Sequence, residues 1–208
     1  MTPNKKYRLS SLAAVLLLTG FGVSVPATVS AQSKTEPAAQ SISTANVPDV
    51  QIVVSPDPTG QWVIAAVYPS KTDRKKAEAR AKEMLALGKW QTSGLLFENQ
   101  ALERKDNPKG MAPPPVMSSV TLSTKGNIVN YADGTIDLEP FIRAYRDLGR
   151  LNLLFLVPGT FKYRGPQGHS DEDIDLKYAS GGSALTFVVQ VKNPKLEKLR
   201  LPRHEPVV

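Results

Sequence analysis

One eight-residue stretch, Gly168 to Asp175, gathers most of the residue types that could do chemistry. It contains four carboxylates and one of the two histidines of the chain. Carboxylate oxygens at alternate positions, as in Asp171, Asp173 and Asp175, are the ligands that a loop offers to Ca²⁺. The spacing makes these three aspartates the weak candidates for a divalent-cation site.

A calcium loop of the EF-hand type also needs glycine at its sixth position and glutamate at its twelfth. Counted from Asp171, those positions hold Leu176 and Gly182, so the ligand that closes the cage is missing. A strand explains the spacing better, because Ile174, Leu176 and Tyr178 would face one side and the charged residues the other. We expect a turn and the solvated face of an edge strand, with no metal and no cofactor.

The neighbouring residues His169, Ser170 and Asp171 are the types found in a nucleophilic triad. Adjacent residues point apart, however, and no Gly-x-Ser-x-Gly elbow surrounds any serine. The absence of cysteine also excludes thiol nucleophiles, thiolate zinc sites and disulfides. The sequence therefore predicts no catalytic residue, and it favours a protein that is not an enzyme.

A small hydrolase acting on a saccharide through paired carboxylates is one alternative. Its candidate acids are Glu98, Asp133, Asp137 and Glu139. Glycoside hydrolysis needs two carboxyl groups at a defined separation. Sequence alone gives no such distance, so the pairing of these acids is left to the structure.

Hydrophobic periodicity places these residues on alternating strands and helices. Helices are expected at 71–88 and from an Asp137 cap to Leu148. Strands are expected at 51–54, 61–68, 92–99, 117–123, 127–131, 151–157, 160–163, 174–178 and 184–192. The pattern predicts an α+β fold, a mainly antiparallel sheet with two helices packed on one face. The alternative is an immunoglobulin-like β-sandwich with helical insertions.

Three strand arrangements follow from the turn residues. The strands 117–123 and 127–131 are expected to form a hairpin, and the last three strands a meander. The almost unbroken apolar run 151–157 is typical of a strand covered on both faces, so it is expected at the centre of the sheet.

The first predicted helix, 71–88, is rich in lysine and arginine. Glu78 lies three or four residues from Lys75 and Lys82, and Arg80 lies three residues before Glu83. Such spacings favour ion pairs along a helix, so the helix is expected to neutralise its own positive stripe. Adhesion to anionic surfaces through this helix is a further alternative function.

The first 31 residues have the three regions of a secretory signal peptide. A basic start precedes an apolar run over residues 12–25, and a small-residue cleavage site ends at Ala31. Pro26 ends the run before the roughly 20 residues that a spanning helix needs. We expect cleavage after Ala31, no transmembrane segment thereafter, and a secreted or periplasmic protein. Retention of the segment as a membrane anchor is the alternative.

Composition divides the rest of the chain into three parts. A flexible leader is expected at 32–49, a single α+β domain at 50–192, and a flexible basic tail at 193–208. Without the signal peptide, 23 basic and 19 acidic residues leave a net charge of +4, too small for a nucleic-acid-binding domain. We expect an exported, non-enzymatic binding or scaffolding protein of the cell envelope or extracellular space, whose partner is a protein or an envelope polymer.

Overall fold

The computed structural model describes residues 47–101, 116–126, 128–130, 135–157, 162–163, 167–201 and 206–207. All of them belong to one compact unit that spans residues 43–208. The signal peptide and residues 32–46 of the leader lie outside the described residues and stay predictions. Across the described ranges, no helix has both the length and the apolar character needed to span a membrane.

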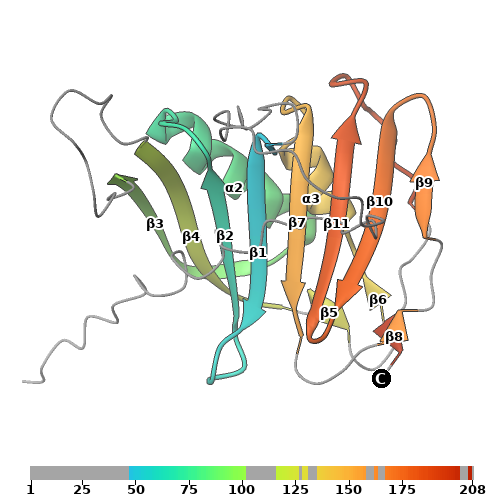
Figure 1. Ribbon diagram of the computed structural model, residues 1–208. Helices are drawn as coiled ribbons and strands as arrows, with labels where there is room; N and C mark the ends of the chain where they lie inside the picture. Colours follow the sequence, from blue (N-terminus) through green and yellow to red (C-terminus); the bar gives the residue numbers. More distant parts are fainter. Residues whose placement is uncertain are drawn as a thin grey trace, which may run out of the picture. The chain divides into compact units, whose positions relative to one another are not determined.

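Eight strands form one mixed sheet (Figure 1). They are β1 (Val50–Pro56), β2 (Trp62–Tyr68), β3 (Gln91–Ala101), β4 (Val116–Lys125), β7 (Arg150–Leu156), β9 (Gly168–Ser170), β10 (Ile174–Gly181) and β11 (Ala184–Val191). Their order is β3-β4-β2-β1-β7-β11-β10-β9. All neighbours are antiparallel except β1 and β7, which are parallel.

Two short ladders accompany this sheet. They pair β5 (Val129–Asn130) with β6 (Thr135–Ile136), and β8 (Lys162–Tyr163) with β12 (Pro206–Val207). The predicted α+β fold with a mainly antiparallel sheet is confirmed. The immunoglobulin-like alternative requires two large sheets packed face to face, whereas the main strands here lie in a single sheet.

Helix α2 (Arg74–Gly88) begins three residues later than predicted and ends, as predicted, at Gly88. The Asp73 side chain accepts a hydrogen bond from the Lys76 backbone N–H at 2.9 Å, which caps the first turn. Lys89 adopts a left-handed conformation, with φ of 54°, and ends the last turn. The helix therefore occupies most of the predicted range 71–88.

Helix α3 (Glu139–Ala144) is shorter than the prediction, which extended it to Leu148. Its N-cap residue is Leu138 and not the predicted Asp137, whose side chain accepts a hydrogen bond from the Glu139 N–H at 3.0 Å. After Ala144 the chain continues in turns, from which Tyr145 and Leu148 still face the core. Apolar spacing therefore continued past the end of the helix, and the periodicity could not mark where the helix stops.

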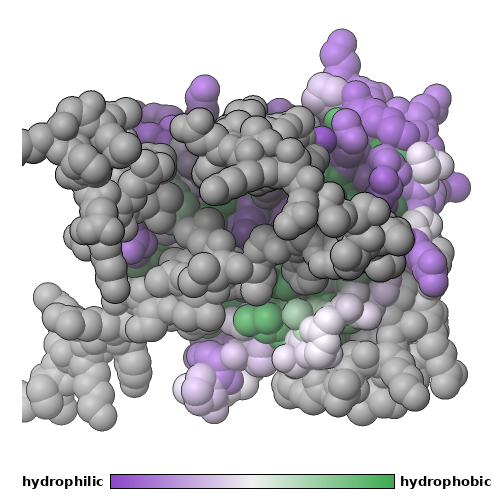
Figure 2. All heavy atoms as spheres, in the orientation of Figure 1, coloured by the Kyte–Doolittle hydropathy of each residue, from purple (hydrophilic) through white to green (hydrophobic). Residues whose placement is uncertain are grey.

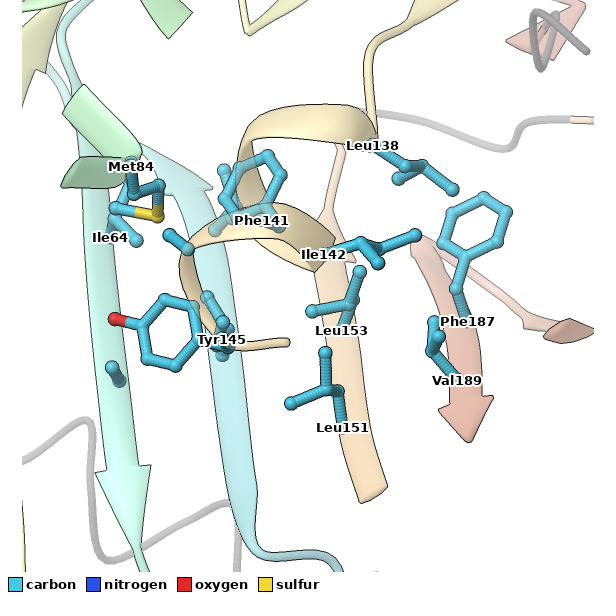
Figure 3. Packing of buried hydrophobic residues seen from close by; sticks show 14 of the residues in the cluster. Ile64, Met84, Leu138, Phe141, Ile142, Tyr145, Leu151, Leu153, Phe187 and Val189 are labelled. Carbon is cyan, nitrogen blue, oxygen red and sulfur yellow. The ribbon is translucent and has the colours of Figure 1, made fainter. Parts of the chain in front are cut away.

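The hydrophobic core lies between the helices and one face of the sheet (Figure 3). Ile142 of α3 lies next to Leu153 on β7. Phe155 makes edge-to-face contacts with Phe141 and with Phe187, with ring centroids 5.5 and 5.8 Å apart. Burying each such side chain contributes about 1.5–3 kcal/mol, so this layer holds α3 against the sheet.

Two predicted strand pairings were wrong. Strand β4 lies between β2 and β3, so both of its edges are occupied and it forms no hairpin with β5. In the C-terminal half, the strand that pairs with β10 on the side away from β11 is β9, whereas the prediction placed residues 160–163 there. Strand β10 is therefore an inner strand, and the expectation that it forms an edge was also wrong.

Strand β7 lies in the middle of the sheet, as its apolar run indicates. Leu151, Leu153 and Phe155 face the helices and belong to the core cluster. The alternate residue Leu154 and its neighbour Val53 on β1 are 8% and 5% exposed, but neither belongs to that cluster. Their side of the sheet lies opposite the helices.

The segment 193–201, placed by the sequence in the C-terminal tail, adds two residues to the core. Leu196 and Leu199 are 3% and 6% exposed within the core cluster. The Arg143 guanidinium of α3 also donates to the backbone oxygen of Glu197 at 2.7 Å. This segment therefore packs on the same side of the sheet as the helices.

Candidate functional site: the lysine face of α2

The acidic stretch forms the turn between β9 and β10. Asp171 Oδ1 accepts hydrogen bonds from the backbone N–H groups of Asp173 and Ile174, each at 2.8 Å. Asp173 Oδ1 accepts from the Asn193 side-chain amide at 2.8 Å, and Asp175 lies on β10. Within the described residues, no three His, Cys, Asp or Glu side chains form a metal-binding group. The first two candidate carboxylates hold the turn together.

The triad-like residues of this turn have different partners. His169 Nε2 lies 2.6 Å from Asp171 Oδ2, whereas Ser170 Oγ receives a hydrogen bond from Lys192 Nζ at 3.1 Å. Slight burial raises the pKa of Asp171, but the N–H of Ile174 and the His169 ring outweigh it and the pKa is lowered overall. Hydrophilic residues gather over this end of the sheet, at the upper right of Figure 2. The geometry is that of a stabilised polar turn.

The carboxylates proposed for a hydrolase are engaged at separate places. Asp137 accepts a hydrogen bond from the Glu139 N–H, and Glu139 forms an ion pair with Arg143, whose Nε lies 2.9 Å from Oε1. Glu98 is exposed on β3, at the edge of the sheet. Asp133 lies outside the described residues. No contact in the described part of the chain brings Glu98 to the acids of α3.

Helix α2 packs closely on the sheet because its inner face is largely small. The buried residues are Ala77, Ala81, Met84 and Leu85. Two alanines, Ala79 and Ala86, are exposed on the opposite side. They lie within about 40° of Lys75 around the helix axis, at 100° per residue. The outer surface of α2 therefore combines lysines with short side chains.

Glu78 does not neutralise the lysines of this surface. Its Oε1 lies 2.7 Å from Nε of Arg74, four residues earlier on the flank of the helix. The predicted pairing of Glu78 with Lys75 and Lys82 was wrong. Arginine presents a planar fork that matches a carboxylate, which gives Arg74 the advantage over the two lysines.

The other acid of the helix pairs with a residue outside it. Glu83 Oε1 lies 3.5 Å from Arg146 Nη1, in the turn after α3. Arg80 pairs with Asp147 of the same turn, through Nη2 and also through Nε, which lies 3.1 Å from Oδ1. The predicted pair of Arg80 with Glu83 was therefore also wrong, since each residue has a partner across the gap between α2 and α3.

Five exposed lysines remain along the outer side of α2. Lys75 and Lys82 lie within about 20° of each other around the axis and about 10.5 Å apart along it. Lys76 lies on the flank, and Lys71 and Lys89 stand at the two ends. Within the described ranges, no acidic side chain forms an ion pair with any of these five. We call this set the lysine face.

A partly buried polar cluster of Tyr68, Arg80, Tyr145 and Asp147 joins α2 to the turn after α3. The Arg80 guanidinium holds the pKa of Asp147 below its usual value, and Asp147 in turn raises the pKa of Arg80. Burial raises the pKa of Tyr68 and of the fully buried Tyr145. Neither tyrosine hydroxyl makes a hydrogen bond of normal geometry within the described residues. Tyr145 has no access to solvent, whereas the Asp147 side chain is largely exposed.

Of the described aromatic residues, Trp62, Trp90 and Tyr178 pack against other aromatic or core side chains. Trp62 is 6% exposed and lies in the core cluster, while Trp90 packs on Phe141 with ring centroids 5.3 Å apart. Tyr178 packs on Phe187 with centroids 5.5 Å apart. These side chains contribute to the interior, which agrees with the default role of aromatic residues on apolar strand faces.

Comparison of the chain with known protein families matched no family model, and comparison with curated protein sequences found no match. The choice of the candidate site therefore rests on the geometry of the lysine face alone. Sequence reasoning found the basic helix but missed Arg146 and Asp147, whose partners lie on another element. No periodicity within the helix could have indicated those two residues.

Proposed function

We propose that this protein is an exported, non-enzymatic binding protein of the cell envelope or extracellular space, and that the lysine face of α2 contacts an anionic surface. The observation that carries the proposal is the distribution of partners on α2. Both glutamates of the helix pair with arginines, and the five lysines keep their charge facing solvent. A set of like charges on one exposed surface attracts a polyanion.

The position of two lysines supports a binding role. Lys75 and Lys76 lie in the first turn of α2, where the helix has its positive end and no acidic residue. Cations at this end are unfavourable for the helix by a few tenths to about 1 kcal/mol each. Exposed lysines that lower the stability of the helix are consistent with a surface that binds a ligand.

The expected surface is flat and bears phosphate or carboxylate groups. The side chains of Ala79 and Ala86, which lie between the lysines, are short and do not project from the helix. A planar surface can therefore approach the helix closely. Each lysine near an anionic membrane surface contributes about 1 kcal/mol of attraction. The predicted signal peptide supports a location where anionic envelope lipids and polymers are present.

Sedimentation with phospholipid vesicles tests this function. We expect the purified protein to sediment with vesicles that contain anionic phospholipid and to remain in solution with purely zwitterionic vesicles. Binding must weaken as sodium chloride rises from about 20 to 500 mM, because salt screens surface charges. Equal binding to both kinds of vesicle, or binding that does not change with salt, would contradict the proposal.

A saccharide hydrolase has less support from the described carboxylates. Of its described candidates, Asp137 and Glu139 act at the start of α3, and Glu98 lies on an edge strand. Glycoside hydrolysis needs two carboxyl groups facing one bond. The lysine face has direct support from the ion pairing around it, so it carries the proposal.

A further inference from the structure

Strand β3 forms one edge of the main sheet (Figure 1). It pairs with β4 on one side, and no strand in the described part of the chain pairs with it on the other. Residues 91–94 and 98–101 are exposed without interruption, although a strand with one covered face normally alternates between buried and exposed residues. The backbone N–H and C=O groups along such an edge are a template for pairing with another chain.

The sequence of β3 lacks most of the features that keep edge strands from pairing. Such strands are commonly very short, or they carry lysine or proline. β3 has 11 residues, none of them lysine or proline, and Glu98 is its only charged residue. The strand at the other edge of the sheet, β9, has only 3 residues. A β-bulge between Thr92 and Gly94 interrupts β3 near its start, and residues 94–101 beyond it keep a regular register.

The middle of β3 is complementary to itself. Leu95, Leu96 and Phe97 are apolar, and mostly small or polar residues flank them on both sides. If a second β3 pairs antiparallel about a two-fold axis through Leu96, each Leu95 lies opposite the Phe97 of the other copy. The two Leu96 side chains then lie opposite each other. Apolar side chains opposed in this way stabilise antiparallel sheets, and such reciprocity is the mark of a two-fold interface between identical chains.

This pairing preserves the two faces of the sheet. Leu95 and Phe97 pack against the core cluster, on the side of the helices. Leu96 faces the other side and is 49% exposed, more than any other large apolar residue of the described ranges. A two-fold axis perpendicular to the sheet leaves every residue on its own face. The pairs of Leu95 with Phe97 therefore extend the core layer across the junction, and the two Leu96 side chains cover each other.

The charge of Glu98 favours the register that is centred on Leu96. In that register Glu98 lies opposite Gly94 of the other copy, and the two glutamates are four residues apart along the junction. That separation is about 13 Å, which exceeds the screening length of about 8 Å at physiological salt. An axis through Phe97 would bring the two glutamates to diagonal positions about 7–8 Å apart, where they repel each other.

From this self-complementarity we propose that β3 pairs antiparallel with β3 of a second copy of the chain, about a two-fold axis through Leu96. The pairing joins the two sheets into one. A strand of this length, at about 3.4 Å per residue, in a layer about 10 Å thick gives a footprint on the order of 400 Å² per copy. That area is about half of the 800 Å² per partner in standard interfaces, so we expect a weak dimer with a micromolar dissociation constant.

The same axis places both lysine faces on one side of the dimer. Helix α2 lies on the side of the sheet that carries the core cluster, and an axis perpendicular to the sheet does not exchange its sides. Two lysine faces can then contact one flat anionic surface together, which strengthens binding through effective concentration. This consequence rests on the proposed function, whereas the pairing of the two strands does not.

Sedimentation equilibrium of the protein as recovered from expressing cells tests the pairing. The wild type is expected to dimerise at micromolar concentration. Leu96→Lys places two ammonium groups opposite each other at the axis and should raise the dissociation constant about tenfold or more. Val188→Lys is the matched control, because Val188 is 41% exposed but lies on the inner strand β11. It should leave the dimer intact, and circular dichroism should show the same fold for both variants.

A thiol cross-linker tests the register. The chain has no cysteine, so Leu96→Cys introduces a single thiol, which in the dimer lies beside that of the second copy. A short bismaleimide should join two copies of Leu96→Cys and leave Val188→Cys monomeric. Equal cross-linking of the two variants would contradict the register.

Two results of sedimentation equilibrium would overturn the proposal itself. One is a wild type that stays monomeric at every concentration, which would leave the edge of β3 to a strand of a different protein. The other is a dimer that Leu96→Lys does not weaken, because a different surface would then hold the copies together.

Discussion

The Nε atom of Arg74 lies 2.7 Å from Oε1 of Glu78, and this contact determines the charge of the outer surface of α2. Glu78 lies three residues after Lys75 and four before Lys82 on the helix. Its engagement with Arg74 on the flank leaves both lysines without an acidic partner in the described part of the chain. The helix therefore presents net positive charge to solvent, although its composition includes acids at suitable spacings.

Replacing Lys75 by glutamate should change stability and binding in opposite directions. A negative charge in the first turn of α2 is favourable at the helix N-terminus, so Lys75→Glu should raise the free energy of unfolding by about 0.3–1 kcal/mol. The same change should weaken sedimentation with anionic vesicles. Urea denaturation measures the first effect. Lys195→Glu, which alters an exposed lysine outside α2, is the matched control and should change neither quantity appreciably.

Asp147→Asn should lower stability at neutral pH and have little effect in acid. The Arg80 guanidinium lowers the pKa of Asp147, so the ionised carboxylate stabilises the fold above its unfolded pKa of about 3.9. That contribution is lost as pH falls through the lower pKa of the folded state. The Asp147 side chain is 56% exposed, so we expect a cost below about 1 kcal/mol.

Thermal melting of Asp147→Asn and wild type from pH 7 to pH 2 checks this effect. The two melting temperatures should differ by about 2–4 °C at most above pH 5 and should converge below pH 4. A difference that stays constant over the whole range would show that the ion pair with Arg80 is not its source.

Gly88→Ala should destabilise the fold although alanine is the better helix former. A Cβ atom at Gly88 would lie 2.4 Å from Cε2 of Trp90, whose ring packs on Phe141. Moving the ring should cost about 1–3 kcal/mol, more than the gain of up to about 1 kcal/mol from helix propensity. Urea denaturation gives the difference in the free energy of unfolding.

The Trp90→Ala background provides the control for that substitution. Without the indole ring, Gly88→Ala should be neutral or stabilising, and the two substitutions should show strong coupling in a double-mutant cycle. Additive effects would mean that the close approach of Trp90 to Gly88 does not limit the site.

Sequence patterns predicted the parts of this fold that depend on local signals. The end of α2 at Gly88 was predicted, and the apolar run 151–157 identified the central strand. Pairing failed where two strands competed for one partner. The hairpin expected after β4 does not form because β4 is already paired with β2 and β3. Competition of this kind depends on the whole sheet, which no local pattern describes.

In the candidate site, too, the local feature was predicted and the contacts with distant residues were not. The sequence located the basic helix but assigned its ion pairs from spacing within the helix. The partners of Arg80 and Glu83, which are Asp147 and Arg146, follow α3 and lie more than 60 residues away along the chain. The aspartates at 171 and 173 hold a turn, a role that the spacing of ligand types could not distinguish from metal binding.

The most direct test compares the vesicle binding of two doubly substituted variants that have the same net charge. Lys75→Glu/Lys82→Glu removes the centre of the lysine face, and Lys195→Glu/Lys198→Glu makes the same change in the segment 193–201. Two lysines at about 1 kcal/mol each predict at least a 30-fold loss of partitioning onto anionic vesicles for the first variant. The second should bind almost as the wild type does. Equal losses in the two variants would contradict the account, because binding would then depend on net charge and not on the lysine face.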